Sequence, residues 1–197
     1  MDLIDSLVHD GWLKTPRIIE AFRKVSREDF VPEYQRVKAN FNIPLSIGYN
    51  QTISQPLVTA FMIELLDPVG KILDIGSGSG WTTVILAHLA DYVWGVDRIA
   101  ELVEFAKKNS HSYACNNLEF VLTERDIGYL PAGKVDRILV SAAASCKKDI
   151  APLFQQLEPE GIMVVPIKES LWKFEGDQAT EYPGFVFVPL ISSPFKD

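Results

Sequence analysis

The sequence predicts an α/β fold built on a doubly wound, mostly parallel sheet. Short apolar runs rich in Val and Ile alternate along the chain with longer segments of helical periodicity. Runs without polar alternation are typical of strands buried on both faces, as in a parallel sheet covered by helices. Helical spacing near the N-terminus adds two extra helices, and two apolar runs near the C-terminus predict an antiparallel hairpin.

The length and composition favour one domain. The chain has 197 residues, of which 47% are hydrophobic, enough to bury a core without disulfides. We therefore expect a single domain over residues 1–197. Residues 1–56 would form the N-terminal helices and a loop, and residues 57–197 the α/β core.

The charge and the scarce metal-ligating residues exclude several classes of protein. The formal net charge of −7 disfavours broad binding to nucleic acids or anionic membranes. Cys115 and Cys146 are too few for a disulfide framework, and the three histidines are scattered, so we expect reduced thiols and no metal. Glu64 interrupts the longest apolar stretch, and neither a signal peptide nor a membrane span is predicted. A cytoplasmic location is the expectation, and the oligomeric state stays open.

Local patterns define each element in turn. Apolar residues at helical spacing, from Leu3 to Trp12 and from Ile18 to Val25, predict two helices, with Pro16 in the first turn of the second. Between residues 31 and 56 periodicity is lost and Pro, Gly and Asn accumulate, which predicts a long irregular connection. Its aromatic residues indicate that it is ordered. The elements predicted after it are helix 57–66, strand 71–75, helix 82–89, strand 92–96, helix 99–110, strand 118–122, strand 137–141, helix 150–157, strand 162–167, and hairpin arms 171–174 and 185–190.

The most informative segment follows the strand at 71–75. Gly76, Gly78 and Gly80 occupy alternate positions before a helix. Glycines let a ligand approach the backbone, and the N–H groups at a helix start favour an anionic group. A tight turn without a ligand is the alternative. However, Asp97 ends the next strand roughly twenty residues on, where a carboxylate can hydrogen-bond a ribose diol. This pairing predicts a cofactor that contains a nucleoside.

The glycine spacing distinguishes between nucleoside cofactors. A dinucleotide fingerprint would need glycine at position 81 or 83, where the chain has Trp81 and Thr83. S-adenosylmethionine has no pyrophosphate. Its carboxylate would suit the loop N–H groups, and its ammonium would face Asp74. We therefore expect this cofactor, with a simple helix cap as the alternative role for Asp74.

Residues 47–56, Ile-Gly-Tyr-Asn-Gln-Thr-Ile-Ser-Gln-Pro, closely resemble the signature segment of the protein-L-isoaspartate O-methyltransferases. The similarity also includes residues 27–32, 74–80, 96–102, 142–144, 157–159 and 187–190. It implies a Rossmann-like sheet of the class I methyltransferase type. It also implies methyl transfer from S-adenosylmethionine to the free carboxylate of L-isoaspartyl residues in damaged proteins or peptides. The ester then cyclises to a succinimide, which permits repair.

The resemblance also implies roles for particular residues. Ser54 matches the serine that the family usually assigns to the active site, and its neighbours fall where the family contacts the cofactor. The family's Gly-Asp-Gly turn near the adenine matches residues 123–128, where Glu124 and Arg125 replace Asp and Gly. The cofactor-binding residues predicted from the loop and the resemblance together are Ile53, Ser54, Gln55, Thr59, Asp74, Gly76, Ser77, Gly78, Asp97, Arg98, Glu124 and Arg125.

A carboxylate acceptor needs little acid–base assistance. With a pKa of about 4 it is already ionised at neutral pH, which agrees with the absence of clustered His or Cys. Catalysis would rest on in-line positioning and on exclusion of water. Ser54 would donate a hydrogen bond that orients the acceptor or orders its loop. The alternative role for Ser54 is that of a turn-stabilising hydroxyl.

Departures from the family pattern leave other functions open. Residues 145–148 and 166–169 differ near the expected substrate rim, which allows a methyltransferase of the same fold that acts on a small-molecule carboxylate. The altered turn at 123–126 allows a non-catalytic module for cofactor binding or protein interaction, with Glu124 in a plain surface loop. Lys147 and Lys148 would either attract an acidic peptide or solvate the start of a helix.

Overall fold

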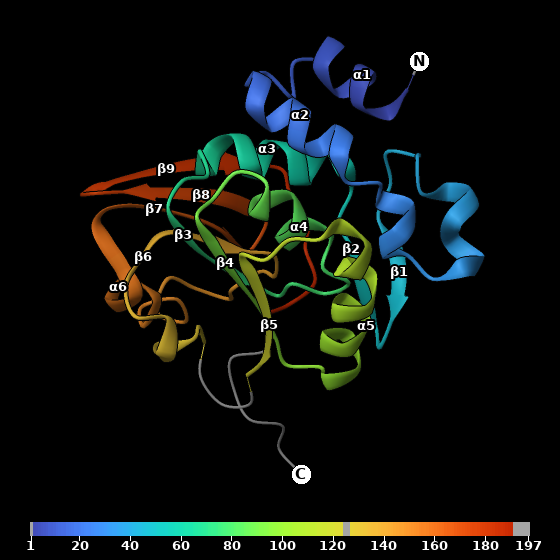
Figure 1. Ribbon diagram of the computed structural model, residues 1–197. Coiled ribbons are helices and arrows are strands. Elements are labelled where there is room, and N and C mark those ends of the chain that lie inside the picture. The colour runs from blue at the N-terminus through green and yellow to red at the C-terminus, as the bar shows by residue number, and fades with distance from the viewer. Residues whose placement is uncertain (1, 124–126, 191–197) are drawn as a thin grey trace.

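A computed structural model describes residues 2–123 and 127–190, and its centre is a seven-stranded sheet (Figure 1). The strand order is β5-β4-β3-β6-β7-β8-β9, with parallel pairing from β5 to β7 and antiparallel pairing of β7 with β8 and β8 with β9. This confirms the predicted mostly parallel sheet. The strands of this sheet are β3 (Lys71–Ile75), β4 (Tyr92–Asp97), β5 (Leu118–Leu122), β6 (Val135–Val140), β7 (Leu157–Ile167), β8 (Ser170–Glu175) and β9 (Gln178–Pro183).

Helices cover both faces of the sheet, but unequally. The α-helices are α1 (Leu3–His9), α2 (Pro16–Lys24), α3 (Pro56–Leu66), α4 (Trp81–Ala87), α5 (Ala100–Ser110) and α6 (Leu153–Gln156). The 3₁₀ helices are η1 (Arg27–Phe30), η2 (Glu33–Lys38), η3 (His111–Tyr113) and η4 (Leu130–Ala132). Among the described residues, no helix has the length and apolar character needed to span a membrane.

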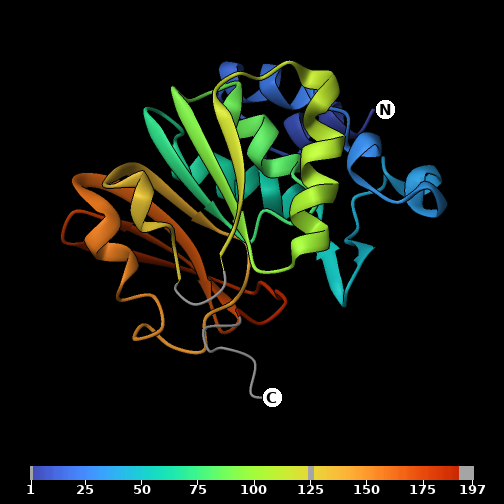
Figure 2. The ribbon, with the colours of Figure 1, turned by 60° about the horizontal axis from the view of Figure 1, so that its bottom comes forward.

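Neighbouring residues of one strand enter different cores because side chains alternate along a strand. Ile72 of β3 belongs to the larger core, which packs against α1 to α5. Leu73, the next residue, belongs to the smaller core beneath α6 and η4. Figure 2 shows α5 lying against β4 and β5. The sheet is therefore buried on both sides, with the thicker helical layer on the side of Ile72.

The two N-terminal helices are fastened to the core by specific polar contacts. On α3, the Glu64 carboxylate accepts hydrogen bonds from the backbone N–H groups of Lys14 and Thr15, at 2.8 and 2.9 Å. The indole N–H of Trp81 donates to the carbonyl of Val25, just after α2. These contacts place the chain that follows α2 directly beside the start of α4.

The connection between residues 31 and 56 is more regular than predicted. It contains η2 and an antiparallel pair of strands, β1 (Leu45–Gly48) and β2 (Gln51–Ile53). Tyr49 and Asn50 join them with φ of 54° and 56°, and positive φ at both central residues is what a tight hairpin of this kind requires. The prediction of a wholly irregular loop was wrong because the strands are too short to show periodicity.

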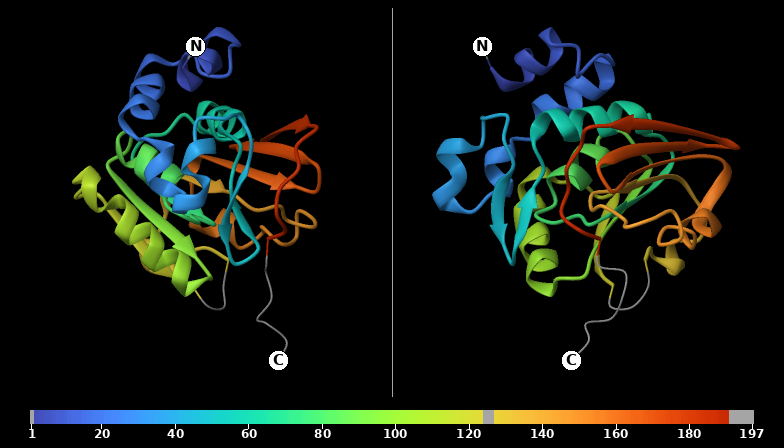
Figure 3. Two further views of the ribbon diagram at one scale, coloured as in Figure 1. Left: turned by 90° about the vertical axis from the view of Figure 1, so that its right-hand side faces the viewer. Right: turned by 180° about the vertical axis from the view of Figure 1, so that it is seen from behind.

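The predicted C-terminal hairpin exists, but its second arm was placed wrongly. It is β9, which follows β8 after Gly176 and Asp177, and Gly176 has a φ of 54°. Residues 185–190 instead return across the ends of the parallel strands, where Ala143 donates to Val188 O and accepts from Leu190 N. Figure 3 shows this red segment leaving β9 and passing α3.

The helix predicted at 150–157 is reduced to the four residues of α6. Leu157 has extended backbone and pairs with Val135, so β7 begins there and runs for 11 residues. Pairing in the sheet thus overrides the local helical pattern.

Candidate functional site

A pocket lies at the carboxyl ends of β3, β4 and β6, around the loop that follows β3. In the sheet, β3 lies between β4 and β6. Successive strands are therefore added on one side of β3 up to β5, and the strand order then reverses to the other side with β6. Such a reversal creates a crevice in which ligands of open α/β sheets bind. The empty volume, open mouth included, is about 950 Å³. The pocket therefore occupies the place that the topology reserves for a ligand.

The glycines of this loop are needed for its backbone. Gly76, Gly78 and Gly80 have φ of 79°, 54° and 94°, values that other residues rarely adopt. A Cβ on Gly80 would lie 2.9 Å from Phe120 Cζ and 3.0 Å from Ala106 Cβ. The last glycine thus allows the loop to pack tightly on β5 and α5.

Three N–H groups at the start of the loop have acceptors within the protein. Gly76 and Ser77 donate to Val96 O at 2.8 and 3.1 Å, and Gly78 donates to Asp97 Oδ2 at 2.9 Å. The expectation that the loop N–H groups hold the carboxylate of a cofactor stays a prediction. The three paired N–H groups fix the loop against the end of β4.

Asp97 stands in the pocket wall at the end of β4. Its Oδ1 accepts from Arg98 N at 2.7 Å and Ile99 N at 3.0 Å, and its Oδ2 accepts from Gly78 N. Burial raises the pKa of Asp97, while these three hydrogen bonds act in the opposite direction. The carboxylate is held rigidly at the position predicted for a contact with a ribose diol.

Asp74 lies beneath the loop and is fully buried. Its Oδ2 accepts from Thr83 Oγ1 at 2.6 Å, a residue inside α4, whose N-cap is Gly80, so the helix-cap alternative is wrong. Burial raises the pKa of Asp74 to about 7; the Thr83 hydrogen bond opposes this shift and the charge of Asp97 adds to it. Among the described residues, neither Asp74 Oδ1 nor Ser77 Oγ has a hydrogen-bond partner.

The β1–β2 hairpin and the chain after it form the opposite side of the pocket. Ile53 and Ser54 line it, as predicted. Gln55 and Thr59 lie behind the lining: Gln55 Nε2 donates to Asn42 O at 2.9 Å, and Thr59 donates to Gln55 O from its backbone N–H and its hydroxyl. These bonds give both residues a place in the framework of the loop, and their contacts with a cofactor stay predictions.

The structure thus brings together most of the predicted cofactor residues. The pocket lining contains Ile53, Ser54, Gly76, Ser77, Gly78, Asp97 and Arg98. Glu124 and Arg125 lie outside the described residues, so their contacts with the adenine remain predictions. The residues that sequence reasoning did not assign to the site are Ile47, Gln51, Thr52, Ile75, Ser79, Trp81, Thr82, Val96, Ile99, Leu102, Thr123, Ile127, Gly128, Ala142, Val188, Pro189 and Leu190.

Most of these unassigned residues lie in segments that resemble the family, and the resemblance identified the segment without showing which of its residues face the pocket. Residues 74–80, 96–102, 123–128 and 142–144 contain several of them. The signature segment already contained Ile47, Gln51 and Thr52, and the resemblance near the C-terminus included residues 187–190. Ser141, which the sequence places at a strand end, also lines the pocket.

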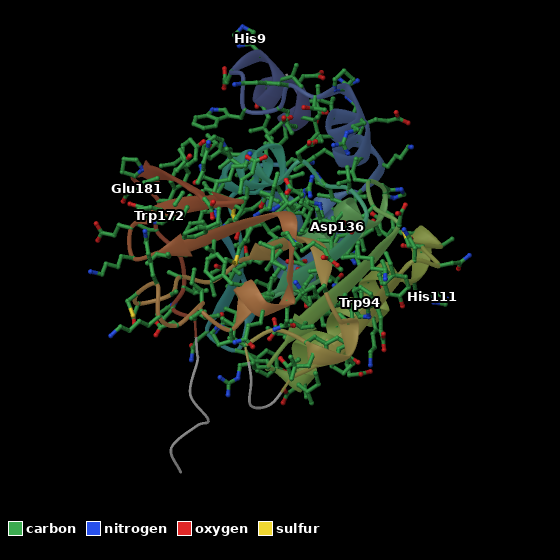
Figure 4. The ribbon with its side chains drawn as sticks, turned by 90° about the vertical axis from the view of Figure 1, so that its left-hand side faces the viewer. His9, Trp94, His111, Asp136, Trp172 and Glu181 are labelled. Carbon is green, nitrogen blue, oxygen red and sulfur yellow. The ribbon has the colours of Figure 1, made fainter. Side chains whose placement is uncertain are left out.

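The two lysines of the expected substrate rim are both exposed, but Lys147 has aromatic neighbours. Its Nζ lies 3.8 Å from the ring centre of Trp172 and 5.7 Å from that of Phe174. Trp172 is paired in register with Glu181 on the neighbouring strand, and the two side chains lie close together in Figure 4. Lys147 therefore packs on an aromatic face, which the reading of a simply solvated lysine did not include.

The described parts of the chain contain no cluster of three or more His, Cys, Asp or Glu side chains that could hold a metal ion. His9 and His111 lie on separate parts of the surface (Figure 4), and both cysteines are free. The polar groups that line the pocket are a carboxylate, hydroxyls, the Gln51 amide, the Arg98 guanidinium and backbone groups.

The mostly parallel sheet, the glycine loop at its switch point and the acidic residue that ends the next strand define the fold of the class I methyltransferases. A crystal structure of a Plasmodium falciparum protein described as a protein-L-isoaspartate O-methyltransferase, in complex with S-adenosyl-L-homocysteine, has the same fold. Its TM-score is 0.83 at 23% identity, and the match covers 96% of this chain and 97% of that one.

Sequence comparison defines the family more closely. The model of the protein-L-isoaspartate(D-aspartate) O-methyltransferase family matches residues 1–189, and the chain belongs to this family. A protein-L-isoaspartate O-methyltransferase of Ignicoccus hospitalis is 37% identical, with 96% of both chains covered. One from Dictyoglomus turgidum is 42% identical over 95% of this chain and 89% of its own length.

Proposed function

We propose that the chain transfers the methyl group of S-adenosylmethionine to the free carboxylate of L-isoaspartyl residues in damaged proteins or peptides. Family membership supports the acceptor and the cofactor. The observation that carries the proposal is that Ser54, from the signature segment, and the glycine loop line one pocket. Acceptor loop and cofactor loop therefore meet where the two substrates must meet.

The residues present fit this cofactor. The Asp97 carboxylate stands where it would accept hydrogen bonds from the ribose diol, and the apolar side chains of Ile99, Leu102 and Ile127 would contact the adenine. The unpaired Ser77 Oγ is a buried polar atom of the pocket that a polar ligand would satisfy. When bound, the cofactor supplies an electrophilic methyl group on its sulfonium.

The chain's own part in the reaction is positioning. An acceptor carboxylate is ionised at neutral pH and needs no base to become a nucleophile. The Ser54 hydroxyl would donate a hydrogen bond to the acceptor and orient it, while the β1–β2 hairpin would exclude water. No proton has to move to or from the protein in the methyl-transfer step.

A matched pair of peptides tests the proposal. One peptide contains L-isoaspartate and its twin contains L-aspartate at the same position, and methyl incorporation is measured for both with cofactor binding alongside. We expect incorporation into the isoaspartyl peptide alone. Turnover of small carboxylic acids without peptide preference would identify the small-molecule alternative, and tight cofactor binding without turnover would identify a non-catalytic module.

Several sequence predictions remain part of the proposal. These are a single domain over residues 1–197, a cytoplasmic location and no binding to nucleic acids. Limited proteolysis, cell fractionation and a gel-shift assay would test them in turn.

A further inference from the structure

Arg27, in η1, is a buried arginine that donates to backbone carbonyls. Its side chain is almost fully enclosed, with the residue 3% exposed. The distances are 2.9 Å from Nη1 to Ala39 O, 3.3 Å from Nη1 to Phe41 O, 2.9 Å from Nη2 to Ile43 O, 3.0 Å from Nη2 to Ser54 O and 3.5 Å from Nη2 to Ile53 O.

These acceptors lie on the two segments that lead into and out of the β1–β2 hairpin. Residues 39–43 lead into β1, and residues 53–54 lead out of β2. One guanidinium therefore joins both ends of the hairpin at its base. A guanidinium suits this task because its planar fork presents five N–H donors in fixed directions, whereas an ammonium presents three donors from one point.

Arg27 holds its charge without an acidic partner. Within residues 2–123 and 127–190, no salt bridge to Arg27 is present, and desolvation lowers its pKa to about 10. The guanidinium carbon lies 5.5 Å from the ring centre of Trp81, which lines the pocket. A buried cation without a counter-ion is costly, and an apolar side chain would fill the same space without that cost, so packing alone does not account for an arginine here.

We propose that Arg27 is a positioning residue for methyl transfer, which holds the backbone of Ile53 and Ser54 so that the Ser54 hydroxyl is presented to the acceptor in the pocket. The inference rests on the proposed function for the role of Ser54. The clamp on the hairpin itself is independent of that role. Arg27 touches neither substrate and acts through the loop.

Arg27→Lys is the first test, with Arg137→Met as the matched control. Arg137 also donates to backbone carbonyls, those of Leu66 and Asp67, at 2.9 and 3.0 Å, but these lie at the end of α3 rather than beside the pocket. We expect Arg27→Lys to lower kcat on the isoaspartyl peptide about tenfold while the Kd for S-adenosylmethionine changes less than threefold. Arg137→Met should leave kcat within twofold of the wild type, well below the melting temperature of each variant.

Hydrogen exchange provides a readout that does not depend on activity. Arg27→Lys should speed exchange of the amides in residues 45–53, and Arg137→Met should not. Arg27→Met, which removes all the donors, should give the larger effect on both readouts, and if it does not fold, Arg27→Lys decides. Unchanged kcat and unchanged exchange in Arg27→Lys, or an equal loss of kcat in Arg137→Met, would overturn the proposal.

The failure of the proposed function would be a different result. A wild type inactive on the isoaspartyl peptide would refute the proposed function and the role of Ser54, whereas unchanged exchange in Arg27→Lys would refute the clamp alone.

Discussion

Asp74→Asn should make the stability of the ligand-free chain less dependent on pH. The carboxyl group of Asp74 is fully buried, and its pKa is raised from 3.8 to about 7. Asparagine keeps an oxygen that can accept from Thr83 Oγ1, which now lies 2.6 Å from Asp74 Oδ2. The substitution therefore removes the titration and the buried negative charge with little change in shape.

The direction of the pH dependence follows from the pKa of Asp74 in the folded and in the unfolded state. Because the folded-state pKa is above the unfolded value, the folded state binds the proton more tightly. Below pH 4 both states are protonated and no penalty exists; between pH 4 and 7 the unfolded state ionises first and the folded state loses stability as pH rises. A difference of about three pKa units corresponds to about 4 kcal/mol. The advantage of Asp74→Asn over the wild type should therefore grow by this amount from pH 4 to 8.

Denaturant unfolding of both proteins without cofactor, at pH values from 4 to 8, measures this difference. Asp97 is present in both proteins, so only its coupling to Asp74 differs between them. Asp149→Asn is the matched control. Asp149 is only partly buried, and its pKa is lowered by hydrogen bonds, first that of the Ser145 hydroxyl, so its contribution to stability changes below pH 4. A flat difference between wild type and Asp74→Asn across this range would refute the reasoning.

Three further substitutions test the site. Asp97→Ala should weaken S-adenosylmethionine binding in calorimetric titration at least tenfold, because it removes the acceptor of Gly78, Arg98 and Ile99 N–H groups; unchanged affinity would contradict its place in the site. Ser54→Ala should lower kcat with little effect on the Kd for the cofactor, and equal effects on both quantities would count against its role. Gly80→Ala should destabilise the fold by about 1–3 kcal/mol through strain at φ 94° and contact with Phe120, measured by urea unfolding. Gly176→Ala is its control, because Gly176 also has positive φ but lies in open space. An equal loss of stability in both variants would show that packing against Phe120 does not cause the loss.

The elements that sequence reasoning predicted best are those whose own residues are buried. The strand at 71–75 and the loop after it were evident because four of the five strand residues are buried and the loop needs glycine. β9 was missed for the opposite reason. It is an edge strand with mostly exposed residues, so it has no apolar run, whereas residues 185–190 have one because they cover the ends of other strands.

The same distinction applies to the site. The sequence pattern found Asp97 and the glycines because their roles depend on local backbone. Gln55 and Thr59 belong to the signature segment or lie next to it, yet their side chains stabilise the loop from behind. A motif identifies the segment that forms a site, but it does not distinguish residues that face a ligand from residues that hold the segment in place.

The return of residues 185–190 across the strand ends has a consequence for folding. Val188 reaches the same pocket as Ile47, Gly78 and Ser141, so the walls come from segments far apart in the sequence. Closing such long loops is slow and costs chain entropy before contacts compensate for it. A chain in which residues 185–190 have not reached the strand ends has an incomplete binding site, and cofactor affinity becomes a measure of whether the whole chain has folded.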